Sequence, residues 1–207
     1  FGEKVEAFVE NGGSFVTTYF SGVVNETDLA FENGYPGPLA KTLGIWVEEI
    51  DALYEGEHNS IVMSDGSGEY SCGHLADLLH AEGADVLAEY GTDFYAGMPV
   101  LTRNAFGDGA AYYIASDPEA RFLDDFYSDL LAQHGIHSAW DLPEGVEISL
   151  RYKGEQAIAF VLNHNAQPAT IDLGSETYKD LLNDSDVSGE ITLPAYDVRI
   201  LLTTASQ

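Results

Sequence analysis

The chain opens with a helical pattern of apolar residues that leads directly into a strand pattern. From Lys4 to Glu10 the apolar residues recur at helical spacing, and Asn11-Gly12-Gly13 supplies a stop signal. The next run, Ser14 to Phe20, is β-branched and aromatic, which is typical of a buried strand. A helix followed at once by a buried strand is half of an α/β unit. Because such a unit normally has a strand before its first helix, we expect the natural chain to begin further upstream.

The middle of the chain alternates between short apolar runs and polar segments. The pattern predicts a short helix from Leu39 to Leu43 and a strand from Ile45 to Ile50. Residues 55–73 are polar and glycine-rich, with few periodic cues. Two strand-like runs follow, Leu75 to His80 and Ala84 to Tyr90, and the first is equally compatible with a helix.

A hairpin and an amphipathic helix are predicted next. The β-rich runs Met98 to Phe106 and Ala110 to Ala115 flank Gly107-Asp108-Gly109, which is a hairpin turn signal. Asp117-Pro118 then opens a helix that ends at His134-Gly135. One face of this helix carries Phe122, Leu123, Phe126, Tyr127, Leu130 and Leu131.

The pattern changes at Ser138–Pro143, and beyond it only short strands are predicted. Regular short strands with turn signals between them indicate a small β-sandwich. We therefore expect an α/β domain over residues 1–137 and an all-β sandwich domain over 143–207. The predicted strands of the second domain are Val146–Tyr152, Ala157–Asn163, Thr170–Leu173, Glu190–Leu193 and Val198–Thr203.

Charge narrows the classes of partner. Among 207 residues, 35 are acidic and 8 are basic, which gives a net charge of −27. Nucleic acid and anionic membranes are excluded as partners, because phosphate binding needs clustered Lys and Arg. The acidity fits either a solvated coat or cation sites. No apolar run approaches the ~20 residues of a membrane span, and no signal peptide is recognised, so we expect a cytoplasmic location.

Candidate chemistry in the sequence is weak. Cys72-Gly73-His74 suggests a Cys–His nucleophile, but the glycine-rich segment before it is not the strand that a nucleophile elbow requires. The six His residues show no metal-ligand spacing, and one cysteine excludes a disulfide framework. Acidic pairs such as Asp124-Asp125 are expected by chance among 35 acids. The sequence predicts no catalytic residue, metal or cofactor.

Several segments in consistent order resemble one family. The chain is similar to the glycoside hydrolase family 42 β-galactosidases over nearly its whole length. The segments that carry the resemblance are Asn11–Gly22, Gly34–Leu39, Glu82–Ala88, Asp93–Gly97, Thr102-Arg103-Asn104, Phe106–Gly109 and Leu162-Asn163-His164.

This resemblance implies a role without catalysis. Residues to about 137 look like the family's trimerisation domain, which implies a flavodoxin-like fold related to glutamine amidotransferases but without their nucleophile. Residues from about 143 look like its C-terminal β domain. Family members are retaining glycosidases whose two catalytic Glu residues lie on an N-terminal (β/α)₈ barrel, and a barrel takes ~250 residues that this chain does not contain. No catalytic Glu is therefore assigned here, and galactoside substrate would bind only through the parent enzyme's barrel.

The architectural hypothesis is that the first domain mediates a homotrimer. In this trimer it would form part of the wall of a neighbouring subunit's active-site entrance. Functional surface in α/β sheets gathers beyond the carboxyl ends of the strands. The candidate interface residues are Tyr19, Phe20, Ser21, Phe94, Tyr95 and Met98.

Two other hypotheses about the function of the chain remain open. The β domain is a candidate carbohydrate-binding module, for which Tyr152, Phe160, Tyr178 and Tyr196 are the available aromatics. A stand-alone hydrolase that uses Cys72 is the third hypothesis, and it would require a reactive thiolate near neutral pH.

Overall fold

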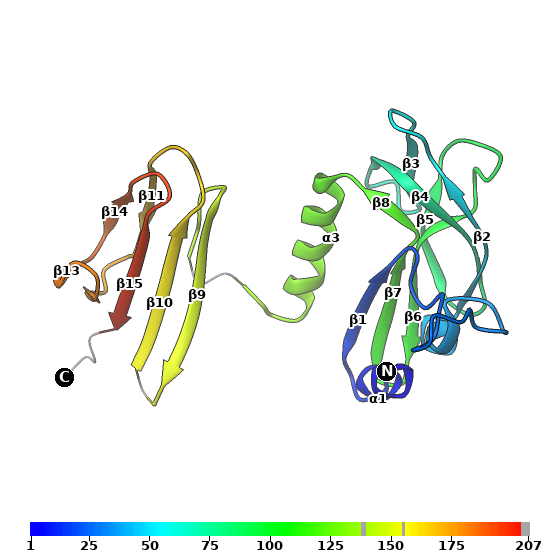
Figure 1. Cartoon of the computed structure of the whole chain (residues 1–207), viewed down its shortest axis with the longest axis horizontal. Helices are drawn as coiled ribbons and strands as arrows, with labels where there is room; N and C mark the ends of the chain where they lie inside the picture. The colour runs from blue at the N-terminus through cyan, green and yellow to red at the C-terminus, as the bar shows by residue number, and fades with distance from the viewer. Residues whose placement is uncertain (138–139, 155, 204–207) are drawn as a thin grey trace. The chain divides into compact units, whose positions relative to one another are not determined.

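The computed structural model describes residues 1–137, 140–154 and 156–203. The chain forms two compact units, unit 1 from Phe1–Leu130 and unit 2 from Leu131–Gln207 (Figure 1). Ser138 and Ala139, at the start of the composition change, lie outside the described residues. The domain boundaries inferred from the sequence stay a prediction.

Unit 1 is built on one eight-stranded sheet. Its strands lie in the order β1-β7-β6-β5-β3-β4-β2, and β8 pairs with β4. Among the strand pairs that the structure describes in this sheet, only β1 and β7 run parallel. The bounds are β1 Ser14–Thr18, β2 Ile45–Ala52, β3 Asn59–Met63, β4 Glu69–Ala81, β5 Asp85–Tyr90, β6 Pro99–Phe106, β7 Gly109–Ile114 and β8 Ser116–Pro118.

The predicted flavodoxin-like α/β fold is wrong for this chain. Such a fold alternates strands with helices around a parallel sheet, whereas β2 to β7 follow one another with no α-helix between them. The helices of unit 1 are α1 Gly2–Glu10, the 3₁₀ turn η1 Gly37–Leu39, α2 Ala40–Leu43 and α3 Ala120–Gln133. The α1–β1 segment misled the prediction, because the chain after it continues mainly through antiparallel neighbours.

Several local predictions also need correction. The segment 55–73, which showed few cues, contains β3 and the start of β4, whereas the strand alternative for Leu75–His80 is confirmed because these residues lie in β4. The first strand ends at Thr18, because Phe20 adopts a left-handed backbone conformation (φ 62°) that a strand does not accommodate. Asp117-Pro118 lies in β8, so the helix begins at Ala120.

The core of unit 1 joins the sheet to the helices. Val9 of α1, Leu43 of α2 and Phe122 of α3 are buried together with strand residues such as Ile61 and Ile114. The hairpin turn between β6 and β7 lies directly against the end of α1. A Cβ at Gly109 would overlap the carbonyl oxygens of Val9 and Gly13, so this close approach requires glycine.

Unit 2 consists of two antiparallel sheets that share one core. The larger has the order β13-β12-β15-β10-β9, and β11 pairs with β14 in the smaller. Val161, Leu201, Ile171 and Leu193 pack between them. The bounds are β9 Val146–Lys153, β10 Gln156–Asn163, β11 Ala169–Asp172, β12 Tyr178–Asp180, β13 Ser185–Val187, β14 Glu190–Leu193 and β15 Val198–Thr203.

The short strands β12 and β13 were not predicted. Their residues are largely polar, so no apolar alternation marks them. Within the part of the chain that the structure describes, no helix is long and apolar enough to cross a membrane.

Candidate assembly surface

Two loops with candidate interface residues emerge from the same end of the unit 1 sheet. The register aligns Thr18 of β1, Ile114 of β7, Leu101 of β6 and Ala88 of β5 in one row. The loop after β1 and the loop between β5 and β6 therefore start about three strand spacings apart, roughly 14 Å. We call this region, formed by residues 19–22 and 91–98, the aromatic end of unit 1.

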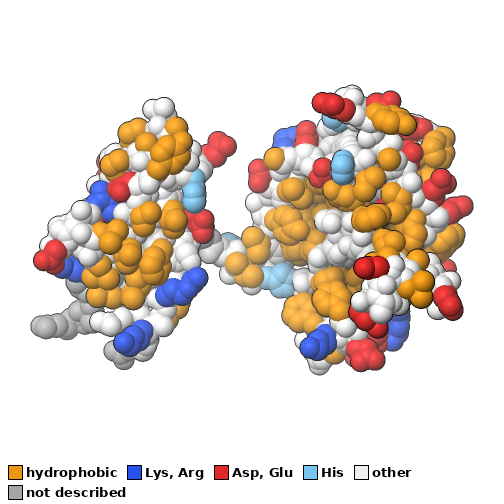
Figure 2. Space-filling view, viewed as in Figure 1, with side chains coloured by type: hydrophobic (Ala, Val, Ile, Leu, Met, Phe, Trp, Pro, Cys, Tyr) orange, Lys and Arg blue, Asp and Glu red, His pale blue; other side chains and the backbone are white. Residues whose placement is uncertain are grey.

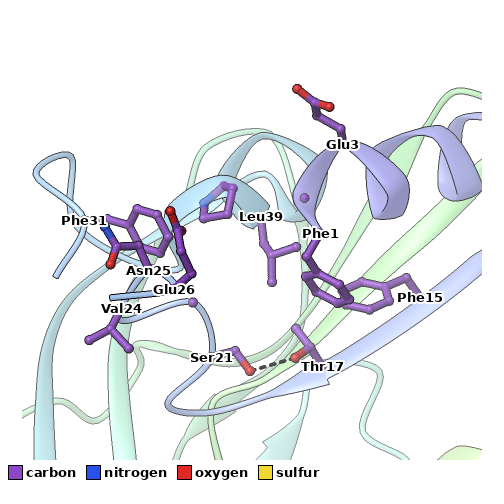
Figure 3. Close-up of a pocket in the computed structure, with 13 residues that line it drawn as sticks. Phe1, Glu3, Phe15, Thr17, Ser21, Val24, Asn25, Glu26, Phe31 and Leu39 are labelled. Carbon is purple, nitrogen blue, oxygen red and sulfur yellow. Dashed lines mark hydrogen bonds between the residues drawn. The ribbon is translucent and has the colours of Figure 1, made fainter. Parts of the chain in front are cut away.

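The loop after β1 is held in one conformation by backbone and hydroxyl contacts. The Tyr19 amide donates to the Ile114 carbonyl at 2.7 Å, and the Ser21 hydroxyl donates to the Thr18 carbonyl at 2.6 Å. Ser21 Oγ also lies 2.7 Å from Thr17 Oγ1 (Figure 3). The Phe20 side chain remains 58% exposed. The loop thus presents an aromatic ring to solvent on a fixed backbone.

A buried carboxylate supports this loop from below. Asp77 of β4 has no exposed surface, and its Oδ2 accepts hydrogen bonds from the Phe20 amide at 3.0 Å and the Tyr113 hydroxyl at 2.5 Å. Burial raises the pKa of Asp77, and the two hydrogen bonds oppose that rise. Asp77 thereby holds Phe20 in its left-handed conformation, which is unfavourable for a residue with a Cβ.

The second loop, between β5 and β6, exposes the ring of Phe94 and buries the ring of Tyr95. Phe94 is 74% exposed, whereas Tyr95 is 1% exposed. The Phe94 and Tyr95 rings meet edge to face at 4.9 Å, and Tyr95 meets Tyr90 in the same way at 4.9 Å. The buried Asn59 side chain fixes the loop start, since its amide donates to the Thr92 carbonyl and its Oδ1 accepts from the Thr92 amide and hydroxyl.

The two loops share buried supports. The Tyr90 hydroxyl, beneath Tyr95, donates to the Ala115 carbonyl at 2.8 Å and lies 3.4 Å from the Asp77 carbonyl. The Asp77 carboxylate in turn holds Phe20. A continuous series of contacts therefore connects the exposed rings of Phe94 and Phe20 through the interior of unit 1.

A hollow of about 720 Å³ lies beside the free edge of β1. Figure 3 shows Ser21 and Thr17 at one side of it and the rings of Phe1, Phe15 and Phe31 around it. The remaining lining includes Val24 and Leu39 together with Glu3, Asn25 and Glu26, so apolar and polar side chains share the wall of the hollow.

The six candidate residues differ in exposure and fall into three groups. The rings of Phe20 and Phe94 are exposed, and Tyr19, Ser21 and Met98 are partly buried. Tyr95 is enclosed, so it supports the loop and cannot make a direct contact in the form described here. That these residues form an interface stays a prediction.

The sequence reasoning missed Asp77 and Tyr113. A usable signal for Asp77 was present, because it is the one charge within the apolar run Leu75–Leu79. Tyr113 gave no such signal, since Tyr112 beside it is the same residue type and the sequence does not show which of the two contacts Asp77.

The environment of Cys72 does not suit a nucleophile. The thiol is buried, and desolvation and the Asp117 carboxylate raise its pKa, while a hydrogen bond with Ser116 acts in the opposite direction. Among the residues that the structure describes, no group of three or more His, Cys, Asp or Glu side chains could hold a metal ion.

The aromatics proposed for sugar binding in unit 2 do not share a surface. Tyr178 is buried in the core, and Phe160 alternates with the core residues Ala159 and Val161, so it faces the other side of its sheet. Tyr152 and Tyr196 are exposed but lie at a strand end and in a turn. The four side chains do not form the flat row that stacks on a sugar chain.

Comparison with known proteins decides the family. The model of the β-galactosidase trimerisation domain of family 42 matches residues 1–137, and that of the β-galactosidase C-terminal domain matches residues 145–202. The chain belongs to the glycoside hydrolase family 42 β-galactosidases. It comprises the trimerisation and C-terminal domains of this family.

Relatives of this family 42 chain are β-galactosidases. BgaA of Planococcus sp. (strain 'SOS Orange') is 53% identical over 202 residues, which cover 96% of this chain and 30% of BgaA. Pbg of Clostridium perfringens is 44% identical over 207 residues, which cover 97% of this chain and 30% of Pbg. The crystal structure of β-galactosidase from Bacillus circulans sp. alkalophilus matches with a TM-score of 0.90 and 49% identity, over 98% of this chain and 31% of that one. The family 42 chain thus spans about 30% of the length of these relatives.

Proposed function

We propose that this chain is the non-catalytic C-terminal part of a β-galactosidase and that its aromatic end mediates assembly of a homotrimer. The observation that carries the proposal is the pair of exposed rings, Phe20 and Phe94, on two fixed loops at one end of the sheet. Hydrolysis of terminal β-galactosides, with retention of configuration, would take place in the preceding part of the parent enzyme, and the assembled trimer would wall its active-site mouth.

Aromatic side chains on fixed loops are well suited to protein contacts. Aromatic anchors dominate many interfaces, and a loop whose backbone is already held loses little conformational entropy on binding. Asp77 and Asn59 hold the two loops before any partner binds. These features favour Phe20 and Phe94 over the other exposed hydrophobic side chains of unit 1.

Charge sets the conditions under which assembly would be seen. Three copies that each carry a net charge of −27 repel one another at low ionic strength. Salt screens such repulsion over a Debye length of about 8 Å at physiological ionic strength. We therefore expect the assembly to strengthen with added salt. We also place the parent in the cytoplasm, which agrees with one buried, unpaired cysteine.

The free edge of β1 is the expected position of an upstream strand. β1 pairs with β7 alone in the described sheet, so its other edge presents backbone N–H and C=O groups that a further strand can pair. The hollow beside β1, which is lined by aromatic and polar side chains, gives an added segment side chains to contact. We propose that the part of the parent chain before Phe1 fills this hollow.

The assembly proposal is tested by Phe20→Ala and Phe94→Ala with Phe8→Ala as the control. Phe8 is 55% exposed, close to Phe20 at 58%, but it lies on α1 at the opposite end of the sheet (Figure 1). Light scattering of the parent enzyme across a dilution series should give a trimer that the first two variants dissociate at higher concentration. Dissociation unchanged in both variants, or shifted equally in Phe8→Ala, would remove the proposal.

A further inference from the structure

The outer face of the larger sheet in unit 2 is apolar although its inner face is already packed. Side chains of a strand alternate between the two faces. Ala159, Val161 and Leu201 point inward and are buried in the core. The residues between them form what we call the outer face of β10 and β15: Ile158, Phe160, Leu162, Val198, Ile200 and Leu202.

These six side chains form one continuous patch. The antiparallel register pairs Ile158 with Leu202, Phe160 with Ile200 and Leu162 with Val198 as direct cross-strand neighbours. Both strands are central in the five-stranded sheet, between β12 and β9. Each of the six retains partial exposure, and Val198 reaches 36%. None is part of the buried cluster that fills unit 2.

An apolar pattern on both faces indicates a sheet that is covered on both sides. An antiparallel sheet with one face in water normally carries polar side chains on that face. Here β10 reads Ala-Ile-Ala-Phe-Val-Leu from Ala157 to Leu162, with no polar alternation. The smaller sheet of β11 and β14 covers the inner face, and nothing described within unit 2 covers the outer one.

Polar and charged side chains border the patch. The register places Arg151 and Ser149 of β9 opposite Ile158 and Phe160 on the outer face, and Lys179 of β12 opposite Leu202. Figure 2 shows hydrophobic side chains gathered over unit 2, with Lys and Arg at their margin. An apolar centre with a polar rim is the usual anatomy of a protein interface.

The size of the patch favours an occupant from the same polypeptide. Two strands with three outward residues each cover roughly 200 Å². A stable complex of separate proteins buries about 800 Å² on each partner. Contacts within one chain need less area, because the covalent connection supplies a high effective concentration.

We infer that the outer face of β10 and β15 docks onto the part of the parent chain that precedes this one. The relatives are more than three times as long as the matched segment, and the matched models are a trimerisation and a C-terminal domain. In the proposed function, the remainder of the parent precedes this chain. The inference depends on one part of the proposed function, namely that a catalytic part of the parent enzyme precedes this chain. It does not depend on the proposed trimer.

The test compares thiol labelling at two positions in two proteins. Phe160→Cys reports on the patch, and Tyr152→Cys on the neighbouring strand β9 is the control, since Tyr152 is exposed and at the strand end. A maleimide probe is applied to the parent enzyme and to the 207-residue chain, and labelled peptides are identified by mass spectrometry. Ile200→Cys repeats the measurement in case Phe160→Cys fails to fold.

The expected result is that the thiol introduced at position 160 labels roughly tenfold or more slowly in the parent than in the 207-residue chain, while the thiol at position 152 labels alike in both. Equally fast labelling at position 160 in both proteins overturns the inference. Equally slow labelling also overturns it, because the cover would then come from the 207-residue chain itself or from a second copy. A parent that labels as expected but is monomeric keeps this inference and rejects only the assembly proposal.

Discussion

The Tyr113 hydroxyl stabilises the aromatic end through its hydrogen bond to Asp77, and its removal tests that support directly. Tyr113→Phe removes one of the two donors to Asp77 Oδ2 and leaves only the Phe20 amide. Oδ1 has no partner among the described residues, so the carboxylate cannot compensate. Hydrogen bonds to a buried charge contribute about 1.5–3 kcal/mol, and bonds between neutral groups about 1 kcal/mol. We expect unit 1 to lose about 2–3 kcal/mol near neutral pH.

The loss depends on pH in a defined direction. Burial raises the folded-state pKa of Asp77, and the Tyr113 hydrogen bond lowers it, so the pKa of Asp77 rises further in Tyr113→Phe. A raised folded-state pKa gives stability that is complete below the unfolded-state pKa of about 3.9 and is lost as the pH rises through the folded-state pKa. The difference between wild type and variant should therefore be smallest in acid, grow with pH and then level off.

Urea unfolding at a series of pH values measures this difference. A Trp140→Phe background leaves Trp46 of β2 as the fluorescent reporter of unit 1. Tyr112→Phe is the matched control, because among the described residues the adjacent Tyr112 hydroxyl accepts a hydrogen bond only from Arg103, at 3.3 Å. Its cost should stay below about 1 kcal/mol. The reasoning fails if the two variants lose equal stability with the same dependence on pH.

Two further predictions concern other parts of the molecule. Gly109→Ala forces a methyl group against two backbone oxygens and should lower the free energy of unfolding by about 3 kcal/mol, measured by calorimetry. The control Gly154→Ala should lower it by about 1 kcal/mol, because Gly154 has open space around it but a positive φ. Equal losses in the two variants would contradict the close packing of α1. Asp180→Asn should destabilise unit 2 by about 3 kcal/mol at neutral pH, since Asp180 is buried against Arg199 at 3.1 Å. Burial raises the pKa of Asp180, but hydrogen bonds from Asn183, the Leu182 amide and Arg199 together lower it, so its stabilisation is present above the unfolded-state pKa and lost as the pH falls through the folded-state pKa. A cost of Asp180→Asn that persists unchanged in acid would refute this account.

Local patterns predicted the local structure well. The turn at Gly107–Gly109 and the amphipathic spacing after Asp117 identified a hairpin and a helix, because each depends on residues close in sequence. The fold class depends on which strands pair at long range, and periodicity does not encode that. The α1–β1 segment has the pattern of an α/β unit, yet β1 lies at the edge of a largely antiparallel sheet.

The candidate site was predictable only in part. Phe20 was a candidate because it lies at the carboxyl end of a predicted strand, and Phe94 because it lies in a glycine-flanked aromatic segment, and both residues are exposed. It could not tell that Tyr95, next to Phe94, is enclosed, because adjacent loop residues have no fixed alternation. The support from Asp77 was also hidden, since 57 positions separate it from Phe20.

The parallel pairing of β1 with β7 also dictates when the aromatic end can form during synthesis. Ser14 pairs with Ala110, 96 positions later, so β1 has no partner in its sheet until nearly all of unit 1 has left the ribosome. The support of Phe20 by Asp77, which Tyr113 holds in turn, is complete only when both of these residues are in place. A truncated or half-folded subunit therefore cannot display the ring correctly. Completion of folding would thus act as a checkpoint that admits only finished subunits to assembly.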